Sequence, residues 1–216
     1  MRFGDRRQAG RALAARLREL RARRPVVVGI ARGGALVADE VARALIAPLD
    51  LALVGRIETP DRPGATLAAV AEGGVLVTAG GRTGARPAAA ELMATASHTR
   101  AELARRAVAF PRLFWHLPVA GRTVVLVDDG ITTGATARAA VRVLRARDAA
   151  RIVLAVPVAP IEALRTVAAE VDLALCLRRQ PWRQATRNLY DELSPLSDEA
   201  LVAALDGRPA FEPVPA

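Results

Sequence analysis

The chain has no lysine, a single cysteine and few aromatic residues among its 216 positions. Because Cys176 has no second cysteine to pair with, an internal disulfide is excluded, which favours a reducing compartment such as the cytoplasm. The absence of lysine also excludes a phosphate-binding loop of the Walker type, which requires one. Uncharged apolar runs such as IVLAVPVAPI are much shorter than the ~20 residues that cross a bilayer, so no membrane segment is expected.

Basic residues exceed acidic residues by nine, and much of this excess lies in residues 1–24, which contain nine arginines. In that segment Leu13, Leu17 and Leu20 recur at helical spacing, which predicts a surface helix with one apolar stripe and solvated arginines. No aromatic residues interleave with the arginines, as the stacking platforms of a single-stranded nucleic-acid site would require. Nucleic acid is therefore not the expected partner. The segment also lacks the apolar core of a secretory signal, so export is not expected.

Three parts of the sequence repeat the order of a short apolar run, a turn and an amphipathic helix. Their apolar runs cover 26–30, 123–127 and 152–158, and further runs at 49–54 and 171–177 follow the first and third helices. Continuous apolar strands separated by helices are typical of a parallel sheet that is covered on both faces. The predicted fold class is therefore α/β, with a doubly wound, mainly parallel sheet flanked by helices.

Between and after these units the sequence has a different character. Two apolar runs about Gly73 and Gly74 predict an antiparallel hairpin, and the Gly- and Arg-rich loop that follows is a candidate lid. Ser197 followed by two acids is typical of a helix start. We expect a single domain over 1–216, with an N-terminal helix at 1–24, a core at 25–177 that contains the hairpin and lid at about 65–86, and a small C-terminal hood at 178–216.

The segment VVLVDDGITTGAT, residues 124–136, combines an apolar run with chemically active residues. In an open α/β sheet, ligands bind beyond the carboxyl ends of the strands, where the second half of this segment is expected. The start of a helix leaves amide N–H groups unpaired, and small residues with hydroxyls allow an anion to approach them closely. The expected phosphate-binding residues are Gly130, Ile131, Thr132, Thr133, Gly134, Ala135 and Thr136.

Two adjacent carboxylates, Asp128 and Asp129, precede this loop and would repel a phosphate. They are suited to a partner with hydroxyl donors, such as a ribose diol, or to a metal ion. A diol and a phosphate at this spacing indicate a ribose 5-phosphate site. The alternative, in which an aspartate caps a turn, would explain one carboxylate but not the second or the threonine cluster.

With these residues the sequence resembles the type I phosphoribosyltransferases, whose motif has four apolar residues, two acids, two variable residues and a hydroxyl-rich loop. VLVDDGITTGAT matches each constrained position, and the N-terminal pattern FxDRxxAGxxLA resembles a bacterial subgroup of that family. The resemblance implies transfer of the 5-phosphoribosyl group of phosphoribosyl pyrophosphate (PRPP) to a nitrogen nucleophile, a nucleobase or related amine, with release of pyrophosphate. It also implies Mg²⁺ held by Asp128 and Asp129, directly or through water.

The resemblance assigns roles to further residues. In the family a second loop, often with a non-proline cis peptide, follows the first strand and binds pyrophosphate. Asp128, Asp129 and Arg56 would be catalytic. For Trp182 and Tyr190 in the hood two roles stay open, stacking on the acceptor and packing within the hood. The residues at the position of the pyrophosphate loop are Ala31, Arg32, Gly33 and Gly34.

The sequence also departs from the family pattern. The subgroup has an Arg–Lys pair after the second strand, whereas this chain has Gly55 and Arg56, so Arg56 alone is expected to meet pyrophosphate. Thr132 stands where purine-salvage members have a carboxylate, which argues against hypoxanthine or guanine as acceptor. Two other classes stay open: a PRPP-responsive regulator that binds nucleic acid through its basic N-terminal face, and a catalytically silent interaction protein. A homodimer stays open as the assembly.

Overall fold

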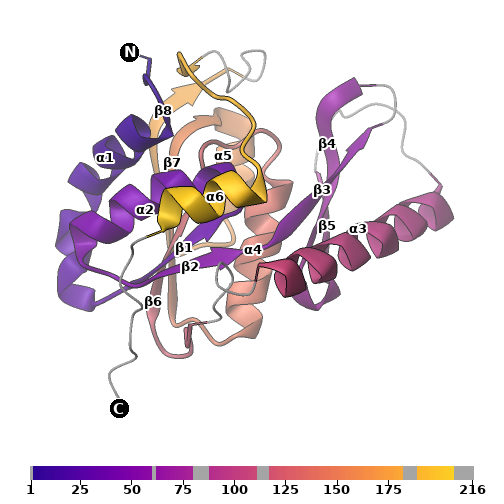
Figure 1. The fold of residues 1–216 in the computed structure, drawn as a ribbon, viewed down its shortest axis with the longest axis horizontal. Helices are drawn as coiled ribbons and strands as arrows, with labels where there is room; N and C mark the ends of the chain where they lie inside the picture. Colours follow the sequence, from indigo (N-terminus) through magenta and orange to yellow (C-terminus); the bar gives the residue numbers. More distant parts are fainter. Residues whose placement is uncertain (1, 60–61, 80–87, 111–116, 182–188, 207–216) are drawn as a thin grey trace.

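A five-stranded parallel sheet lies at the centre of the computed structural model, which describes residues 2–59, 62–79, 88–110, 117–181 and 189–206. The strand order is β2-β1-β6-β7-β8, and every neighbouring pair is parallel (Figure 1). The predicted doubly wound α/β fold is confirmed. The strands span β1 Val26–Ile30, β2 Leu49–Ala52, β6 Thr123–Val127, β7 Arg151–Pro160 and β8 Leu173–Gln180.

Helices cover both faces of this sheet because alternate strand residues point to opposite sides. Val125 and Val127 of β6 pack in one core cluster with α1 (Arg6–Leu17) and α2 (Gly33–Leu45). Residues Val124 and Leu126 pack in a second cluster with α4 (Ala135–Ala146) and α5 (Ile161–Ala168). Burial of each such aliphatic side chain contributes roughly 1.5–3 kcal/mol to the free energy of unfolding. Because both faces of the strands are buried, apolar residues are favoured at every position.

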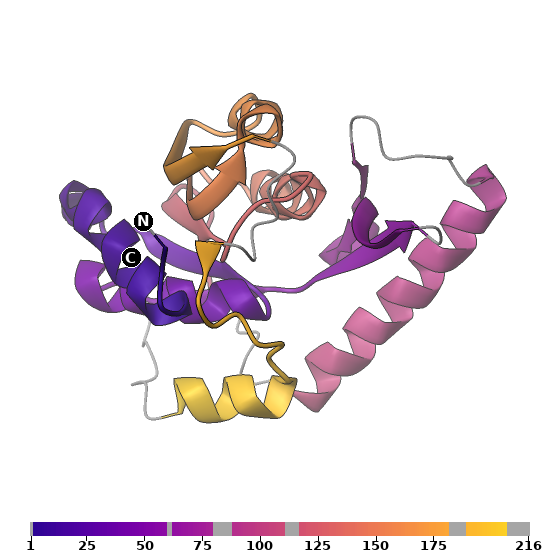
Figure 2. The same cartoon turned by 90° about the horizontal axis from the view of Figure 1, so that it is seen from above.

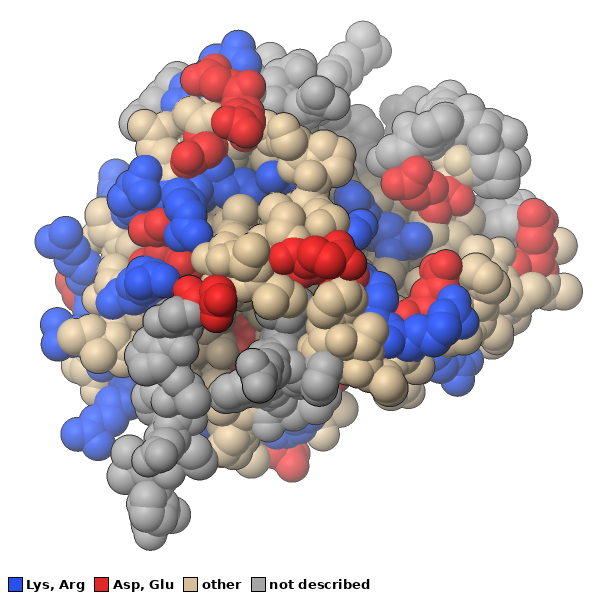
Figure 3. All heavy atoms as spheres, in the orientation of Figure 1, with Lys and Arg blue, Asp and Glu red and all other residues tan. Residues whose placement is uncertain are grey.

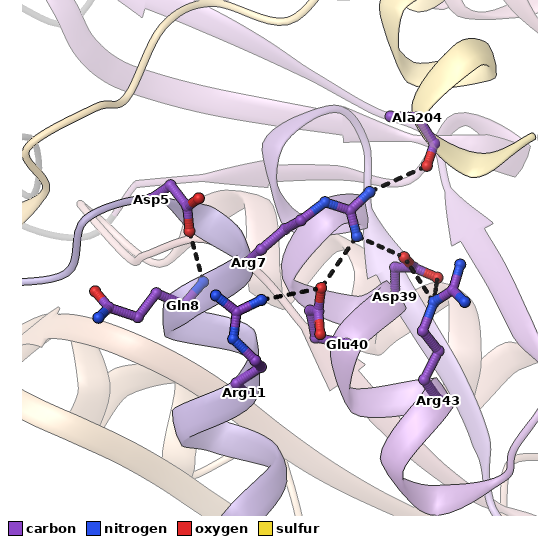
Figure 4. A network of polar contacts seen from close by, with 8 residues as sticks. All are labelled: Asp5, Arg7, Gln8, Arg11, Asp39, Glu40, Arg43 and Ala204. Atoms are coloured by element: carbon purple, nitrogen blue, oxygen red, sulfur yellow. Dashed lines mark hydrogen bonds and ion pairs between the residues drawn. The ribbon is translucent and has the colours of Figure 1, made fainter.

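The N-terminal segment forms α1 and then the 3₁₀ helix η1 (Arg18–Arg23), and its predicted apolar stripe faces α2. Leu13 and Leu17 are buried in the cluster shared with α2. Several arginines are paired rather than solvated: Arg7 donates to the carboxylates of Asp39 and Glu40 at 2.9 and 3.1 Å (Figure 4). On the face shown in Figure 3, arginines and acids therefore alternate over these helices, which offsets part of the local charge.

A second sheet projects from the core and, with α3 (Ala89–Ala109), forms what we call the arm (Figure 2). Its antiparallel strands are β3 Val54–Thr59, β4 Arg62–Ala71 and β5 Leu76–Thr78. Gly73 and Gly74 turn between β4 and β5 with φ of 68° and 80°, which confirms the predicted hairpin. The predicted lid residues 80–86 lie outside the described residues. None of the helices in the described ranges is long and apolar enough to cross a bilayer.

The prediction of one strand over 49–54 was wrong, because two strands of different sheets share this apolar run. The chain leaves the central sheet after Ala52, and β3 then pairs antiparallel with β4 from Val54 onward. Leu53, between them, is 2% exposed and packs in a cluster formed by α2, the arm and α6 (Asp198–Leu205). Leu51, Leu53 and Val54 on both sides of the break are all buried, so hydrophobicity alone does not mark it.

The C-terminal boundary also differs from expectation. The strand predicted at 171–177 is β8 at 173–180, since Arg178 and Gln180 still pair with Val158 and Pro160 of β7. The hood therefore begins later than residue 178. The predicted helix start is confirmed: the hydroxyl of Ser197 accepts from the backbone N–H of Ala200 at 3.1 Å.

Helix α6 is fastened at both ends, with the core on one side and the arm on the other (Figure 2). At its first residue, Arg106 of α3 donates from Nε and Nη2 to both carboxylate oxygens of Asp198, at 2.8 and 2.6 Å. In its last turn the carbonyl of Ala204 accepts from Arg7 of α1 at 3.1 Å (Figure 4). Leu201 between them is fully buried. The helix thus holds the arm against α1 and α2.

Replacing Arg106 by Gln is expected to lower the free energy of unfolding near pH 7 by about 1 kcal/mol. The hydrogen bond with Arg106 lowers the pKa of Asp198, so this stabilisation is present above the unfolded-state pKa and is lost as pH falls through the folded-state pKa. The deficit should therefore shrink near pH 3. Urea unfolding of this variant and of Arg105→Gln, an exposed neighbour, measures it at both pH values. An equal deficit at both would contradict the assignment.

Candidate active site

The loops after β1 and β6 lie side by side at the carboxyl edge of the sheet, where the connections diverge. From β1 the chain continues through α2 to β2, whereas from β6 it continues through α4 to β7 on the other side. In doubly wound sheets such a switch point opens a crevice that binds ligands. We call residues 31–34 the glycine loop and residues 128–136 the acid–threonine loop.

The glycine loop ends at the start of α2, with Arg32 as the residue before the helix. Its Ala31–Arg32 peptide bond is cis, and the N–H of Ala31 donates to the carbonyl of Ala52 at 3.0 Å. The first N–H groups of a helix have no partner within it, so those of Gly33 and Gly34 are suited to an anion. Arg32 is exposed beside them.

The two loops touch so closely that only glycine fits at positions 33 and 34 without a shift of neighbouring atoms. A Cβ on Gly33 would overlap Oδ2 of Asp129, and a Cβ on Gly34 would lie 2.8 Å from Cα of Asp128. Real Cβ atoms essentially never approach other atoms so closely. Both predicted loops therefore belong to one site, in which the two carboxylates lie directly against the glycines.

The two carboxylates differ in their surroundings. Asp128 accepts from the backbone N–H of Asp129 at 2.9 Å. Burial, and next the charge of Asp129, raises the pKa of Asp128 well above its usual value, while the charge of Arg56 acts in the opposite direction. Arg56 is exposed on β3, so its positive charge comes from the arm. Its contact with pyrophosphate stays a prediction.

Two residues hold Asp129, and the sequence predicted this role for neither of them. Nε of Arg6 donates to its Oδ2 at 2.8 Å, and the hydroxyl of Tyr190 donates to its backbone carbonyl at 2.7 Å. Arg6 is the first residue of α1, 123 positions away. The only signal for it in the sequence is its place in the pattern FxDRxxAGxxLA.

Tyr190 occupies a packing position rather than the open position expected for stacking on an acceptor. Its side chain is 2% exposed, and its ring centroid lies 5.6 Å from that of Phe3. Burial, and next the charges of Asp129 and Asp128, raises the pKa of Tyr190 above its usual value, so the hydroxyl stays a donor at neutral pH. Trp182, the other residue expected to stack, lies outside the described residues.

The acid–threonine loop is anchored at one residue and open at others. The N–H of Ile131 donates to the carbonyl of Val158 at 2.9 Å and its side chain is 2% exposed, so Ile131 anchors the loop rather than offering its amide to a phosphate, contrary to expectation. Thr132 is exposed. Buried Thr133 accepts at Oγ1 from the N–H of Ala135 at 3.4 Å, which leaves its hydroxyl proton available.

Gly134 shapes the end of this loop, where α4 begins. Its φ is 83°, a conformation that favours glycine, and a Cβ there would lie 2.7 Å from Val167. The residues that follow, Ala135 and Thr136, contribute the first amide groups of α4 and one half-buried hydroxyl. Together with Gly130 they place small residues at the start of α4, and phosphate binding there stays a prediction.

The described residues contain no group of three or more His, Cys, Asp or Glu side chains that could hold a metal ion. Mg²⁺ commonly takes one or two carboxylates from the protein and the remaining oxygens from substrate and water. The adjacent Asp128 and Asp129 could supply the two carboxylates of such a Mg²⁺ site, with substrate and water as the other ligands. They do not form a site in which every ligand comes from the protein. One oxygen of Asp129 is already bound by Arg6.

Comparisons with known proteins identify the family of the chain. A family profile described as phosphoribosyl transferase domain matches residues 5–178. The chain is 41% identical over 205 residues to Rv0571c of Mycobacterium tuberculosis, which bears the provisional name of a phosphoribosyl transferase. This match covers 94% of the chain and 46% of the relative, so the chain spans about half the length of the curated relatives it matches.

Solved structures give the same result for the fold. The crystal structure of TT1426 from Thermus thermophilus is 40% identical, with a TM-score of 0.75 over 95% of this chain and 98% of that chain. AQ2163 from Aquifex aeolicus has a TM-score of 0.54 at 12% identity, over 84% of this chain and 77% of that chain, which shows likeness of fold alone.

Proposed function

Because the chain belongs to the phosphoribosyltransferase family, we propose that it transfers the 5-phosphoribosyl group of PRPP to a nitrogen nucleophile and releases pyrophosphate. The observation that carries this proposal is the contact between the two loops. The carboxylates of Asp128 and Asp129 lie directly against Gly33 and Gly34, so diol-binding and pyrophosphate-binding groups meet at one point. PRPP has its hydroxyls and its pyrophosphate on adjacent carbons of one ribose, which suits this arrangement.

Each part of PRPP then has a complementary group. The amides and hydroxyls from Thr132 to Thr136 receive the 5-phosphate, as the start of α4 favours an anion. Asp128 and Asp129 accept hydrogen bonds from the ribose hydroxyls. The amides of the glycine loop receive pyrophosphate, and Arg32 adds a positive charge beside them.

In the reaction, the bond between C1 of the ribose and pyrophosphate breaks, and a bond from the acceptor nitrogen to C1 forms. Pyrophosphate leaves with the bonding electron pair, and the nitrogen gives up a proton. Positive charge grows on the ribose, where the nearby carboxylates stabilise it, while Arg32 and Arg56 stabilise the leaving group. Bound Mg²⁺ would neutralise charge on pyrophosphate. The chain's own contribution is mainly positioning and charge complementarity.

The acceptor is a nucleobase or a related amine. Thr132 is exposed where the purine-salvage members carry a carboxylate, so we expect acceptors other than hypoxanthine and guanine. Pyrophosphate release from PRPP over a panel of purines, pyrimidines and amines tests the proposal. A regulatory protein would bind PRPP without turnover on any acceptor, and that outcome would contradict the enzymatic proposal.

Adding PRPP with Mg²⁺ is expected to raise the melting temperature, because a ligand that binds only the folded state stabilises it by mass action. At one hundred times its dissociation constant the gain is about 2.7 kcal/mol. Ribose 5-phosphate should give a smaller shift, since it lacks the pyrophosphate. Differential scanning fluorimetry measures both shifts. A folded protein whose melting temperature did not respond to millimolar PRPP would refute the site.

A further inference from the structure

The guanidinium of Arg6 joins three parts of the chain at the acid pair. Its Nε donates to Oδ2 of Asp129 at 2.8 Å, and its Nη1 donates to the carbonyl of Ser194 at 2.8 Å. The Arg6 and Asp129 side chains are only 13% and 23% exposed. A charge-assisted hydrogen bond in such a partly enclosed position is stronger than one on an open surface. Arg6 therefore restricts where this carboxylate can point.

Enclosure of Oδ2 leaves the other oxygen of Asp129 for a ligand. Oδ2 lies between Nε of Arg6 and Gly33, where even a Cβ would overlap it. The hydrogen bond from Arg6 does not involve Oδ1 of Asp129, so this second oxygen can face a ligand. The geometry thus assigns the two oxygens different partners, protein for Oδ2 and ligand for Oδ1.

The N-terminal residues that carry Arg6 are fixed to a C-terminal segment, residues 189–197, which we call the strap. Phe3 exchanges backbone hydrogen bonds with the strap, donating to Leu189 and accepting from Asp191, both at 2.8 Å. Gly4 accepts from Glu192 at 2.9 Å. These bonds join the two segments that carry Tyr190 and Arg6, and both of these residues bind Asp129. The strap and the N-terminus therefore form a single support for Asp129.

We propose that Arg6 is a positioning residue that orients Asp129 toward the ribose hydroxyls. Arg6 holds the carboxylate, while Tyr190 holds the backbone carbonyl of the same residue. The proposal rests on the proposed function, because it names the support of the same ribose site. Without Arg6, Asp129 can rotate, and its charge is no longer offset beside that of Asp128. Oδ1 is then less often directed at the sugar.

The test compares Arg6→Gln with Arg11→Gln, a control on the same helix whose guanidinium lies 3.6 Å from Glu40 and away from the acid pair. Dissociation constants for ribose 5-phosphate and for inorganic phosphate are measured by calorimetry, together with melting temperatures. Arg6→Gln is expected to weaken ribose 5-phosphate roughly tenfold. Its affinity for inorganic phosphate should equal that of the wild type, and the control should bind both ligands normally.

A double variant separates positioning from direct contact with the ligand. If Arg6 acts only through Asp129, Arg6→Gln combined with Asp129→Asn should bind ribose 5-phosphate no more weakly than Asp129→Asn alone. Losses that multiply would overturn the proposal, as would an Arg6→Gln variant that binds ribose 5-phosphate normally or loses phosphate equally. Wild-type protein that binds neither PRPP nor ribose 5-phosphate would instead refute the proposed function itself.

Tyr190→Phe keeps the proposal testable if Arg6→Gln does not fold. It removes the hydroxyl that donates to Asp129 and keeps the ring against Phe3. A neutral hydrogen bond of this kind corresponds to about a 2- to 12-fold change in an equilibrium constant. We expect a loss in that range for ribose 5-phosphate and none for inorganic phosphate. An unchanged affinity for ribose 5-phosphate would contradict the two-point support of Asp129.

Discussion

Replacing Asp129 by Asn is expected to weaken binding of PRPP and of ribose 5-phosphate by roughly 10- to 150-fold, the equivalent of one charge-assisted hydrogen bond. The amide keeps the shape of the carboxylate and still offers an oxygen to Arg6, so the loop should keep its conformation. We expect inorganic phosphate to bind to the other half of the loop, so its affinity should hardly change. Calorimetric titration of the three ligands measures the difference.

Thr133→Val is the matched variant for the phosphate half of the loop. It replaces a buried hydroxyl by a methyl group of similar size, at a position 8% exposed. Phosphate, ribose 5-phosphate and PRPP should all bind more weakly, because the three ligands share the phosphate group. If Asp129→Asn weakened inorganic phosphate as much as PRPP, the carboxylates would be shaping the loop rather than binding the sugar.

The second large effect is expected for Gly34→Ala, which should reduce both stability and PRPP binding. The new Cβ would lie 2.8 Å from Cα of Asp128 and 3.0 Å from the carbonyl oxygen of Val127. Backbone atoms cannot rotate away as a side chain can, so the two loops must separate. Overpacking of this kind typically costs about 1–3 kcal/mol of unfolding free energy. Urea unfolding and PRPP titration measure the two consequences.

Two further alanine variants sharpen this comparison. At Gly4 the nearest atom to a new Cβ is 3.4 Å away on the flexible side chain of Gln8, so Gly4→Ala should be close to wild type. At Gly33 the overlap is with side-chain atoms, the carboxylate of Asp129 and Nε of Arg6, which can shift only if their ion pair is disturbed. Gly33→Ala should therefore weaken ribose 5-phosphate more than it destabilises the fold. A Gly34→Ala variant as stable as Gly4→Ala would show that the loops are not tightly packed.

Features encoded by neighbouring residues were predictable from the sequence. β1 and β6 begin and end where their apolar runs do, because a strand buried on both faces must be apolar throughout. The start of α6 was predictable because the hydroxyl of Ser197 bonds to a backbone N–H three residues later. The acid pair and the threonines follow β6 directly, so their place at the carboxyl edge follows from the fold class.

Features that depend on partners far away in the sequence could not be predicted from it. From the sequence, Ile131 was expected, like its neighbours in the loop, to offer its amide to a phosphate. In the structure its N–H donates instead to the carbonyl of Val158 on β7. β3 could not be separated from β2, because the partner that draws it into the arm, β4, follows later in the chain. The local pattern of apolar and polar residues indicates which side chains are buried and whether a segment is a helix or a strand. It does not identify the strand with which a buried segment pairs.

The sequence by itself determined the α/β class, the position of both loops and the chemical types of group that each presents. Only the tertiary structure decided how those groups face one another: the glycines against the carboxylates, and Asp129 between Arg6 and Tyr190. The physical reason is separation along the chain. Arg6 and Asp129 are 123 residues apart. Their ion pair depends on α1 packing against α2 and on the strap crossing the sheet edge, and no local periodicity encodes either arrangement.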